Sequence, residues 1–124
     1  MLDTHVGSSG CIGYVVVALG GELDATNAAG TARILQAAVA PQLRIIVDLA
    51  KVTFMDCSSV RELLSARTQV RQAAGALLLA APQPIVRRLL SLLGLIGLLP
   101  VFASVEEAVS GCQEPFRPMP SHAG

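Results

Sequence analysis

The stretch FMDCSSVRELL at residues 54–64 decides the fold of this chain. It follows an apolar run at residues 44–49 that is typical of a buried strand. After it, apolar residues recur at the spacing of one helix face, at Val60, Leu63, Leu64, Val70 and Ala74. We therefore expect a junction between a strand and a helix, with hydroxyl, thiol and carboxylate groups where the helix begins. Backbone N–H groups in a first helical turn lack intrahelical partners, so this position favours anions.

On both sides of the junction, predicted strands alternate with predicted helices. We expect strands at residues 14–19, 44–49, 76–80 and 101–103, and helices at about residues 28–40, 59–74, 84–93 and 104–110. This order predicts a single α/β domain at residues 14–112, with a mixed sheet of about four to five strands packed with about four helices. Residues 1–13 are expected to hold at most an edge strand, and the proline-rich residues 113–124 to form a disordered tail.

Local signals predict how the helix after the junction begins and ends. Ser59 and Glu62 have the S-x-x-E spacing of a capping box, so Ser59 is expected to cap the helix. Ser58 would then be the exposed residue before it. Gly75 is expected to end the helix in a left-handed conformation.

Neighbouring segments carry further expectations. Residues 50–53 are expected to form a connection after the strand, and Phe54 and Met55 to re-enter the core. Asp48 interrupts an apolar strand and is expected at a sheet edge or beside an arginine, without a catalytic role. Ser104 begins another S-x-x-E pattern and is expected to cap the last helix.

Composition excludes several classes of protein. The chain has 124 residues, of which 52% are hydrophobic and 15% charged, so global disorder is not expected. Nine basic and nine acidic residues give no formal net charge, which argues against a nucleic-acid partner. Zero charge combined with many apolar residues favours self-association, and a homodimer is an open expectation.

Cysteine and histidine positions argue against a disulfide framework and a metal site. Cys11, Cys57 and Cys112 are widely spaced and odd in number, and His5 and His122 lie near the termini. We expect neither a metal nor another cofactor. The N-terminus lacks the basic and apolar regions of a signal peptide, so the cytoplasm is the expected location.

The strongly apolar segment at residues 89–102 invites comparison with a membrane span. Its apolar run is shorter than the roughly 20 residues that cross a bilayer, and Pro100 and two glycines interrupt it. We expect part of the core and an exposed apolar patch instead.

Two interpretations of the junction hydroxyls remain open from local chemistry. In the first, the serines only cap a helix. In the second, Ser58 accepts a phosphate, which adds about −1.5 to −2 charges at pH 7 beside Asp56. A partner bound there would have to desolvate that charge, and a penalty of about 3 kcal/mol weakens binding roughly a hundredfold.

Several motifs in order resemble the STAS domain, and most nearly the bacterial anti-sigma factor antagonists. They are GELD at residues 21–24, VDL at 47–49, VTFMDCSS at 52–59, LGL at 93–95, LLP at 98–100 and SVEEA at 104–108. The resemblance implies a non-enzymatic regulator that binds an anti-sigma factor, which is also a serine kinase, and thereby frees a sigma factor. It implies that the kinase phosphorylates Ser58 and ends the binding, and that a serine phosphatase restores it.

The family usually has Asp-Ser-Ser/Thr-Gly at the junction, and this chain departs from it at two positions. Cys57 replaces the first hydroxyl residue, and Ser59 replaces the glycine and becomes an alternative acceptor. The resemblance implies a partner-binding surface made of Glu22, Asp24, Asp56, Cys57, Ser58, Ser59 and Arg61. For Glu22 and Asp24 the alternative is helix capping.

Two other functions remain open. Cys57 near a helix N-terminus can act as a redox-sensitive thiol, or it is simply a small, partly buried residue. The whole domain can instead be an adaptor subunit of a larger assembly, such as a lipid-transport ABC complex or a stressosome-like scaffold, without phosphorylation control.

Overall fold

This computed structural model describes residues 3–9 and 12–113 of the chain. In chain order its elements are β1 (Asp3–Ser9), β2 (Ile12–Leu23), α1 (Ala28–Ala38), β3 (Arg44–Met55), α2 (Cys57–Gln72), β4 (Ala76–Ala80), α3 (Pro84–Leu92), β5 (Val101–Phe102) and α4 (Val105–Gln113). The five strands form one sheet in the order β1-β2-β3-β4-β5. The β1–β2 pair is antiparallel and the other pairs are parallel, which confirms the predicted mixed α/β fold.

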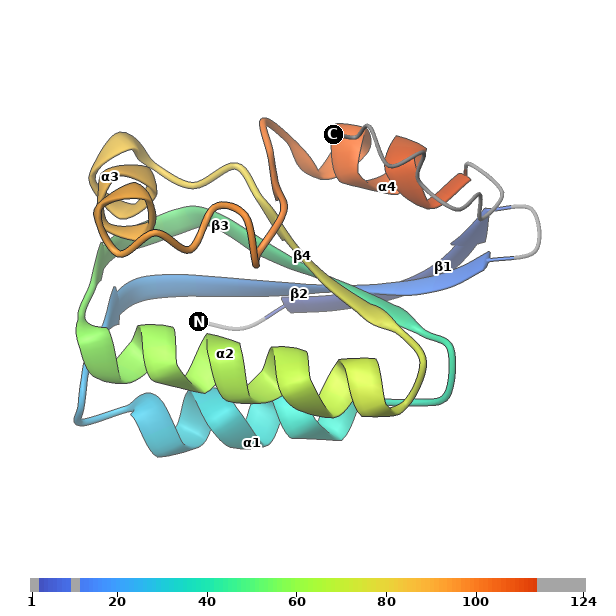
Figure 1. Cartoon of the computed structure of the whole chain (residues 1–124), viewed down its shortest axis with the longest axis horizontal. Helices are drawn as coiled ribbons and strands as arrows, with labels where there is room; N and C mark the ends of the chain where they lie inside the picture. Colours follow the sequence, from blue (N-terminus) through green and yellow to red (C-terminus); the bar gives the residue numbers. More distant parts are fainter. Residues whose placement is uncertain (1–2, 10–11, 114–124) are drawn as a thin grey trace.

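Helices cover both faces of the sheet (Figure 1). The main core lies between the sheet, α1 and α2, where Leu35, Ile45 and Leu63 are almost fully buried, and it extends to α3 through Val86 and Leu90. A smaller apolar cluster lies between the other face and α4. Because β2 and β3 are buried on both faces, their runs of Val and Ile are continuous rather than alternating.

The strand before the junction is longer than the sequence predicted. Residues 50–53 do not form a connection, because β3 continues beside β2 as far as the Leu23↔Met55 pair. Irregular register between Ala18 and Gly20, and again between Gly21 and Glu22, allows both strands to continue. Gly21 has φ +78, a conformation that glycine adopts without steric cost, and β2 continues through both glycines to Leu23.

The end of α2 also differs from the prediction. Ala74, with φ 65, occupies the left-handed conformation that was expected of Gly75. Gly75 is required for a different reason: a Cβ there would lie 2.1 Å from the carbonyl oxygen of Leu43. Its N–H donates to the carbonyl of Val70 at 2.9 Å and closes the last turn of the helix.

Some expectations near the chain ends concern residues that are not described. Asp3–Ser9 form a seven-residue strand at the edge of the sheet, paired along β2, and β2 itself begins at Ile12, before the expected boundary at residue 14. The predicted tail, residues 113–124, lies outside the described residues apart from Gln113, which ends α4. His122 and Cys11 lie outside them too.

The apolar segment at residues 89–102 spans the end of α3, a turn and β5. Leu90 and Leu99 are buried, whereas Leu92 is 75% exposed and Ile96 and Leu98 are also exposed, so the expected apolar patch is present. Within the described ranges, the helices are too short or too polar to cross a membrane.

Candidate functional site

The site is built where β2 and β3 end side by side. Leu23 pairs with Met55, the last residue of β3, and the N–H of Asp56 donates to the carbonyl of Leu23 at 3.1 Å. The chain enters α2 directly after Asp56 and enters α1 after the short turn that follows Leu23. Two connections distant in sequence are therefore fixed next to each other at the carboxyl end of the sheet.

Asp56, and not Ser59, caps α2. Its backbone is extended, with φ −110 and ψ 179, and its Oδ1 accepts the N–H of Ser59 at 3.1 Å. Aspartate is a favoured N-cap, because its side chain satisfies an N–H group of the first turn. The predicted capping box at Ser59 was wrong because β3 continues to Met55 and leaves only Asp56 between strand and helix.

Ser58 is the second residue of α2 rather than an exposed residue before it. Its side chain is half-buried, and its hydroxyl donates to Oδ1 of Asp56 at 2.7 Å. The hydrogen bond from this hydroxyl, and next the one from the Ser59 N–H, hold the pKa of Asp56 below its usual value because both favour the charged carboxylate. Asp56 is consequently ionised at neutral pH.

Ser59 is buried, which separates it from Ser58. The residue is 1% exposed, and its Oγ has no hydrogen-bond partner among the described residues. After the Ser58 hydroxyl and the Ser59 N–H, this nearby hydroxyl also favours a lowered pKa of Asp56, although it lies outside hydrogen-bonding geometry. A kinase could reach this oxygen only if the first turn of α2 opened.

The turn after β2 is organised by its own polar side chains. Oδ1 of Asp24 accepts the N–H of Thr26 at 2.9 Å and also the Thr26 hydroxyl. The side-chain oxygen of Asn27 accepts the N–H of Asp24, and its side-chain nitrogen donates to the carbonyl of Glu22. Asp24 therefore shapes the turn and does not cap α1, whose N-cap residue Asn27 makes no side-chain capping bond.

Exposed side chains surround the junction. Cys57 and Arg61 lie one turn apart on α2 and are exposed, as is Glu22 near the end of β2. Phe54, which the sequence placed in the core, is 44% exposed and pairs with Glu22 across the strands. Alternation along a continued strand would have revealed it, because Phe54 and Met55 must point to opposite faces.

We call these exposed and half-buried residues the junction surface: Glu22, Asp24, Phe54, Asp56, Cys57, Ser58 and Arg61. It contains every residue assigned to partner binding from the sequence except Ser59, which is buried beneath it. It combines an apolar side chain, both signs of charge and one hydroxyl beside a carboxylate.

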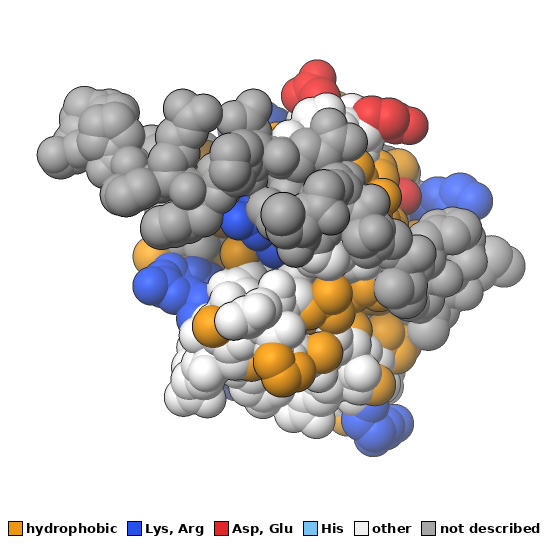
Figure 2. Space-filling view, turned by 90° about the vertical axis from the view of Figure 1, so that its right-hand side faces the viewer, with side chains coloured by type: hydrophobic (Ala, Val, Ile, Leu, Met, Phe, Trp, Pro, Cys, Tyr) orange, Lys and Arg blue, Asp and Glu red, His pale blue; other side chains and the backbone are white. Residues whose placement is uncertain are grey.

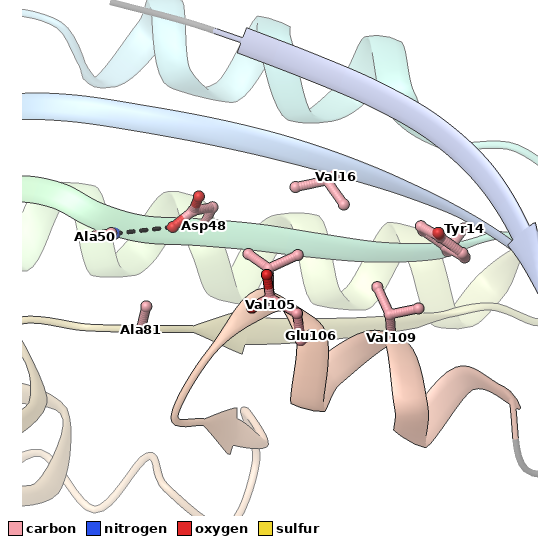
Figure 3. A pocket seen from close by; sticks show the side chains of 8 residues that line it. All are labelled: Tyr14, Val16, Asp48, Ala50, Ala81, Val105, Glu106 and Val109. Carbon is pink, nitrogen blue, oxygen red and sulfur yellow. Dashed lines mark hydrogen bonds between the residues drawn. The ribbon is translucent and has the colours of Figure 1, made fainter.

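Asp48 lies elsewhere, on the face of the sheet covered by α4 (Figure 3). It belongs to β3, which is an interior strand, so the expectation of a sheet edge was wrong. Its Oδ1 accepts the N–H of Ala50 at 3.0 Å. With Tyr14 and Glu106 it lines a hollow of about 520 Å³ between the sheet and α4.

Metal ligation has no support in the part of the chain that is described. Among residues 3–9 and 12–113, no group of three or more His, Cys, Asp or Glu side chains is placed to hold a metal ion. The groups at the junction are a carboxylate, hydroxyls and a thiol.

Comparison with known proteins agrees with this architecture. A candidate anti-sigma factor antagonist of Bordetella bronchiseptica, BtrV, is 28% identical over 103 residues, which are 79% of this chain and 85% of that protein. An anti-sigma factor antagonist from Mycobacterium paratuberculosis matches with a TM-score of 0.77 at 23% identity, over 92% of this chain and 96% of that one.

The anti-sigma factor antagonist SpoIIAA is similar in two states. Its unphosphorylated form matches at 27% identity with a TM-score of 0.69, over 93% of this chain and all of that one (100%). Its phosphorylated form, from Bacillus, matches at 26% identity with a TM-score of 0.64, over 90% of this chain and 98% of that one. A model of the STAS domain family matches residues 6–108, most of the described chain, and this protein therefore belongs to the STAS domain family.

Proposed function

We propose that this protein is an anti-sigma factor antagonist that is switched by phosphorylation of Ser58. In the unphosphorylated state it binds a kinase-type anti-sigma factor through the junction surface and frees a sigma factor. The relatives named anti-sigma factor antagonist support the class of function. The observation that carries the switch is the Ser58 hydroxyl, which is held by Asp56 in the first turn of α2 beside exposed groups.

The hydrogen bonding at the junction explains how a phosphate would act. Transfer of a phosphoryl group to Ser58 Oγ removes the proton that this oxygen donates to Asp56. It replaces an attraction by a repulsion, because Asp56 is ionised and the phosphate carries about −1.5 to −2 charges. The phosphate is turned outward, towards the position of the partner and the free N–H groups of the first turn.

The fold is expected to survive this change. The Ser59 N–H still donates to the Asp56 side chain, and the Asp56 N–H still donates to the carbonyl of Leu23. A partner on the junction surface would have to desolvate the new charge, so we expect affinity to fall roughly a hundredfold. Removal of the phosphate by a serine phosphatase would restore binding. Since all these partners act on transcription or on proteins that control it, we place the protein in the cytoplasm.

Intact mass spectrometry with ATP and the kinase-type anti-sigma factors of the source organism tests this function. We expect one phosphoryl group on the wild type, mapped to Ser58, and none on Ser58→Ala. Ser65→Ala is the matched control, because Ser65 is an exposed serine on the same helix and should not affect phosphorylation. Ser59→Ala should also remain a substrate.

Affinity measurements complete the test. The unphosphorylated wild type should bind the anti-sigma factor, and the phosphorylated protein should bind it roughly a hundredfold more weakly. Normal phosphorylation of Ser58→Ala would disprove the site. If a pull-down from native cells recovered a transport ATPase instead of an anti-sigma factor, the phosphorylation switch would be rejected in favour of the adaptor function.

A further inference from the structure

The edge of β4 is paired with β5 along only part of its length. The pairs are Leu79↔Val101 and Ala80↔Phe102, and the N–H of Leu79 donates to the carbonyl of Pro100 at 2.8 Å. Backbone groups of alternate residues in a strand point to the same side. The N–H and C=O of Leu77 therefore point towards the β5 side, where β5 has not yet begun.

Two features of the sequence stop the ladder before it reaches Leu77. In register, its N–H would face the carbonyl of Leu98, but that oxygen accepts Nε of Arg67 at 2.8 Å. Its C=O would face the nitrogen of Pro100, which has no hydrogen to donate. The N–H and C=O of Leu77 thus have no partner in β5, and Leu77, which is 3% exposed, meets free space only at the hollow beside this edge.

A hollow of about 390 Å³ runs along this edge. Leu77 and Leu78 both line it, although their side chains belong to core clusters on opposite faces of the sheet. A space that both residues line must lie along the strand edge, with backbone as its floor. Leu98 and Pro100 form its far wall.

Positive charge lies on one side of the hollow. Arg67 and Arg71, one turn apart on α2, both line it. Nε of Arg67 donates to the carbonyl of Leu98, which leaves its two Nη groups to donate to another acceptor. Arg71 is exposed. Figure 2 looks onto this end of the molecule: the visible Asp and Glu side chains gather in the upper part, whereas Lys and Arg side chains lie at its left, its right and its lower edge.

We infer that this edge binds an extended acidic peptide segment of a partner protein. One peptide residue pairs with the N–H and C=O of Leu77, as in the addition of a strand to a sheet edge. A Glu or Asp side chain of the segment lies between Arg67 and Arg71, where charge-assisted hydrogen bonds hold it. Figure 1 shows β4 beginning where α2 ends, at the opposite end of that helix from Ser58, so this site stands independently of the proposed switch.

Titration of the ¹⁵N-labelled full chain with acetyl-Glu-Val-Glu-Val-Glu-amide tests the inference by NMR. We expect the largest amide shifts at Leu77 and its neighbours in β4. The same peptide with Gln in place of Glu should bind at least about tenfold more weakly. Arg71→Gln should weaken the acidic peptide by a similar factor and leave the Gln peptide unchanged, whereas Arg33→Gln, an exposed arginine on α1, should change neither.

Several results would overturn the inference. They are absence of binding at millimolar peptide, equal affinity for the acidic and Gln peptides, and equal effects of Arg71→Gln and Arg33→Gln. Shifts confined to the junction surface or to the apolar patch after α3 would place acidic peptides elsewhere. Because no step uses phosphorylation, a negative result leaves the Ser58 proposal untouched, and failure of Ser58 phosphorylation leaves this one untouched.

Discussion

Replacing Ser59 by alanine should stabilise the protein, although Ser59 lies in the candidate site. Its Oγ is buried without a hydrogen-bond partner among the described residues. Alanine keeps the Cβ and removes only this oxygen. The backbone N–H of residue 59, which Asp56 accepts, is unchanged by the substitution.

The size of the effect follows from burial. A buried polar group without a partner costs about 1–3 kcal/mol. The gain in helix propensity from Ser to Ala adds at most about 0.5 kcal/mol, and the small space left by the oxygen reduces the gain. We expect the free energy of unfolding to rise by about 1–2 kcal/mol, which raises the Tm by several degrees in a domain of this size.

Urea unfolding followed by circular dichroism, under reducing conditions, measures this change. Ser65→Ala is the control, because it makes the same substitution at an exposed position of α2. The control should report helix propensity alone, about 0.5 kcal/mol or less. The difference between the two variants isolates the buried hydroxyl, provided that the urea m-value is the same for both.

A stability of Ser59→Ala no greater than that of Ser65→Ala would refute the reasoning. It would mean that the hydroxyl is satisfied in solution, through Asp56 or a buried water molecule. A clear loss of stability would identify a hydrogen bond to Asp56 as part of the helix cap. Ser59 would then be a structural partner of Asp56 rather than an unpaired group.

Three further predictions concern other positions. Gly75→Ala should lower the free energy of unfolding by roughly 3 kcal/mol, because the added Cβ would lie 2.1 Å from the carbonyl oxygen of Leu43. Gly30→Ala is the control: its added Cβ points into open space, so this helix substitution should raise the free energy of unfolding by about 1 kcal/mol. Asp56 has a lowered pKa, so its charge stabilises the fold above its unfolded pKa of about 3.9, and this contribution is lost as the pH falls through the lower folded value. Asp56→Asn, which keeps a capping side chain, should therefore be less stable than the wild type at pH 7, and the difference measured by urea titration should shrink below about pH 4; a pH-independent difference would contradict this. The redox state of the exposed Cys57 thiol should not control binding: for the wild type, as for Cys57→Ser, affinity for the anti-sigma factor should be the same under oxidising and reducing conditions. Loss of affinity on oxidation in the wild type alone would make Cys57 a redox sensor.

Elements set by local chemistry were predictable from the sequence. The strand at residues 76–80 has the predicted bounds, because its apolar run is short and glycine precedes it. Ser104 accepts the N–H of Glu107 at 3.1 Å, as the S-x-x-E pattern predicted for the last helix. Gly94, with φ +72, follows the end of α3 as expected of a glycine after a helix.

Elements set by distant partners were not predictable in the same way. The continuation of β3 depends on its register with β2, more than 30 residues earlier in the chain. The need for glycine at position 75 comes from the backbone of Leu43, which no local pattern contains. The same difference applies at the site, where resemblance grouped Glu22 with Ser58 but could not reveal that Ser59 is buried and Phe54 exposed.

One oxygen of Asp56 explains why a switch at Ser58 need not disturb the fold. Oδ1 accepts two hydrogen bonds: one from the Ser58 hydroxyl at 2.7 Å and one from the Ser59 N–H at 3.1 Å. The proposed phosphorylation of Ser58 would abolish only the first, because it would replace the hydroxyl proton and leave the backbone unaltered. The second bond keeps the beginning of α2 in place, so the new charge is presented on an unchanged scaffold. Binding can then fall while the first turn of α2 stays folded, and the fold loses only what the Ser58 hydroxyl contributes to the charged Asp56. A phosphate on buried Ser59, by contrast, would have to unfold the first turn to be accommodated at all.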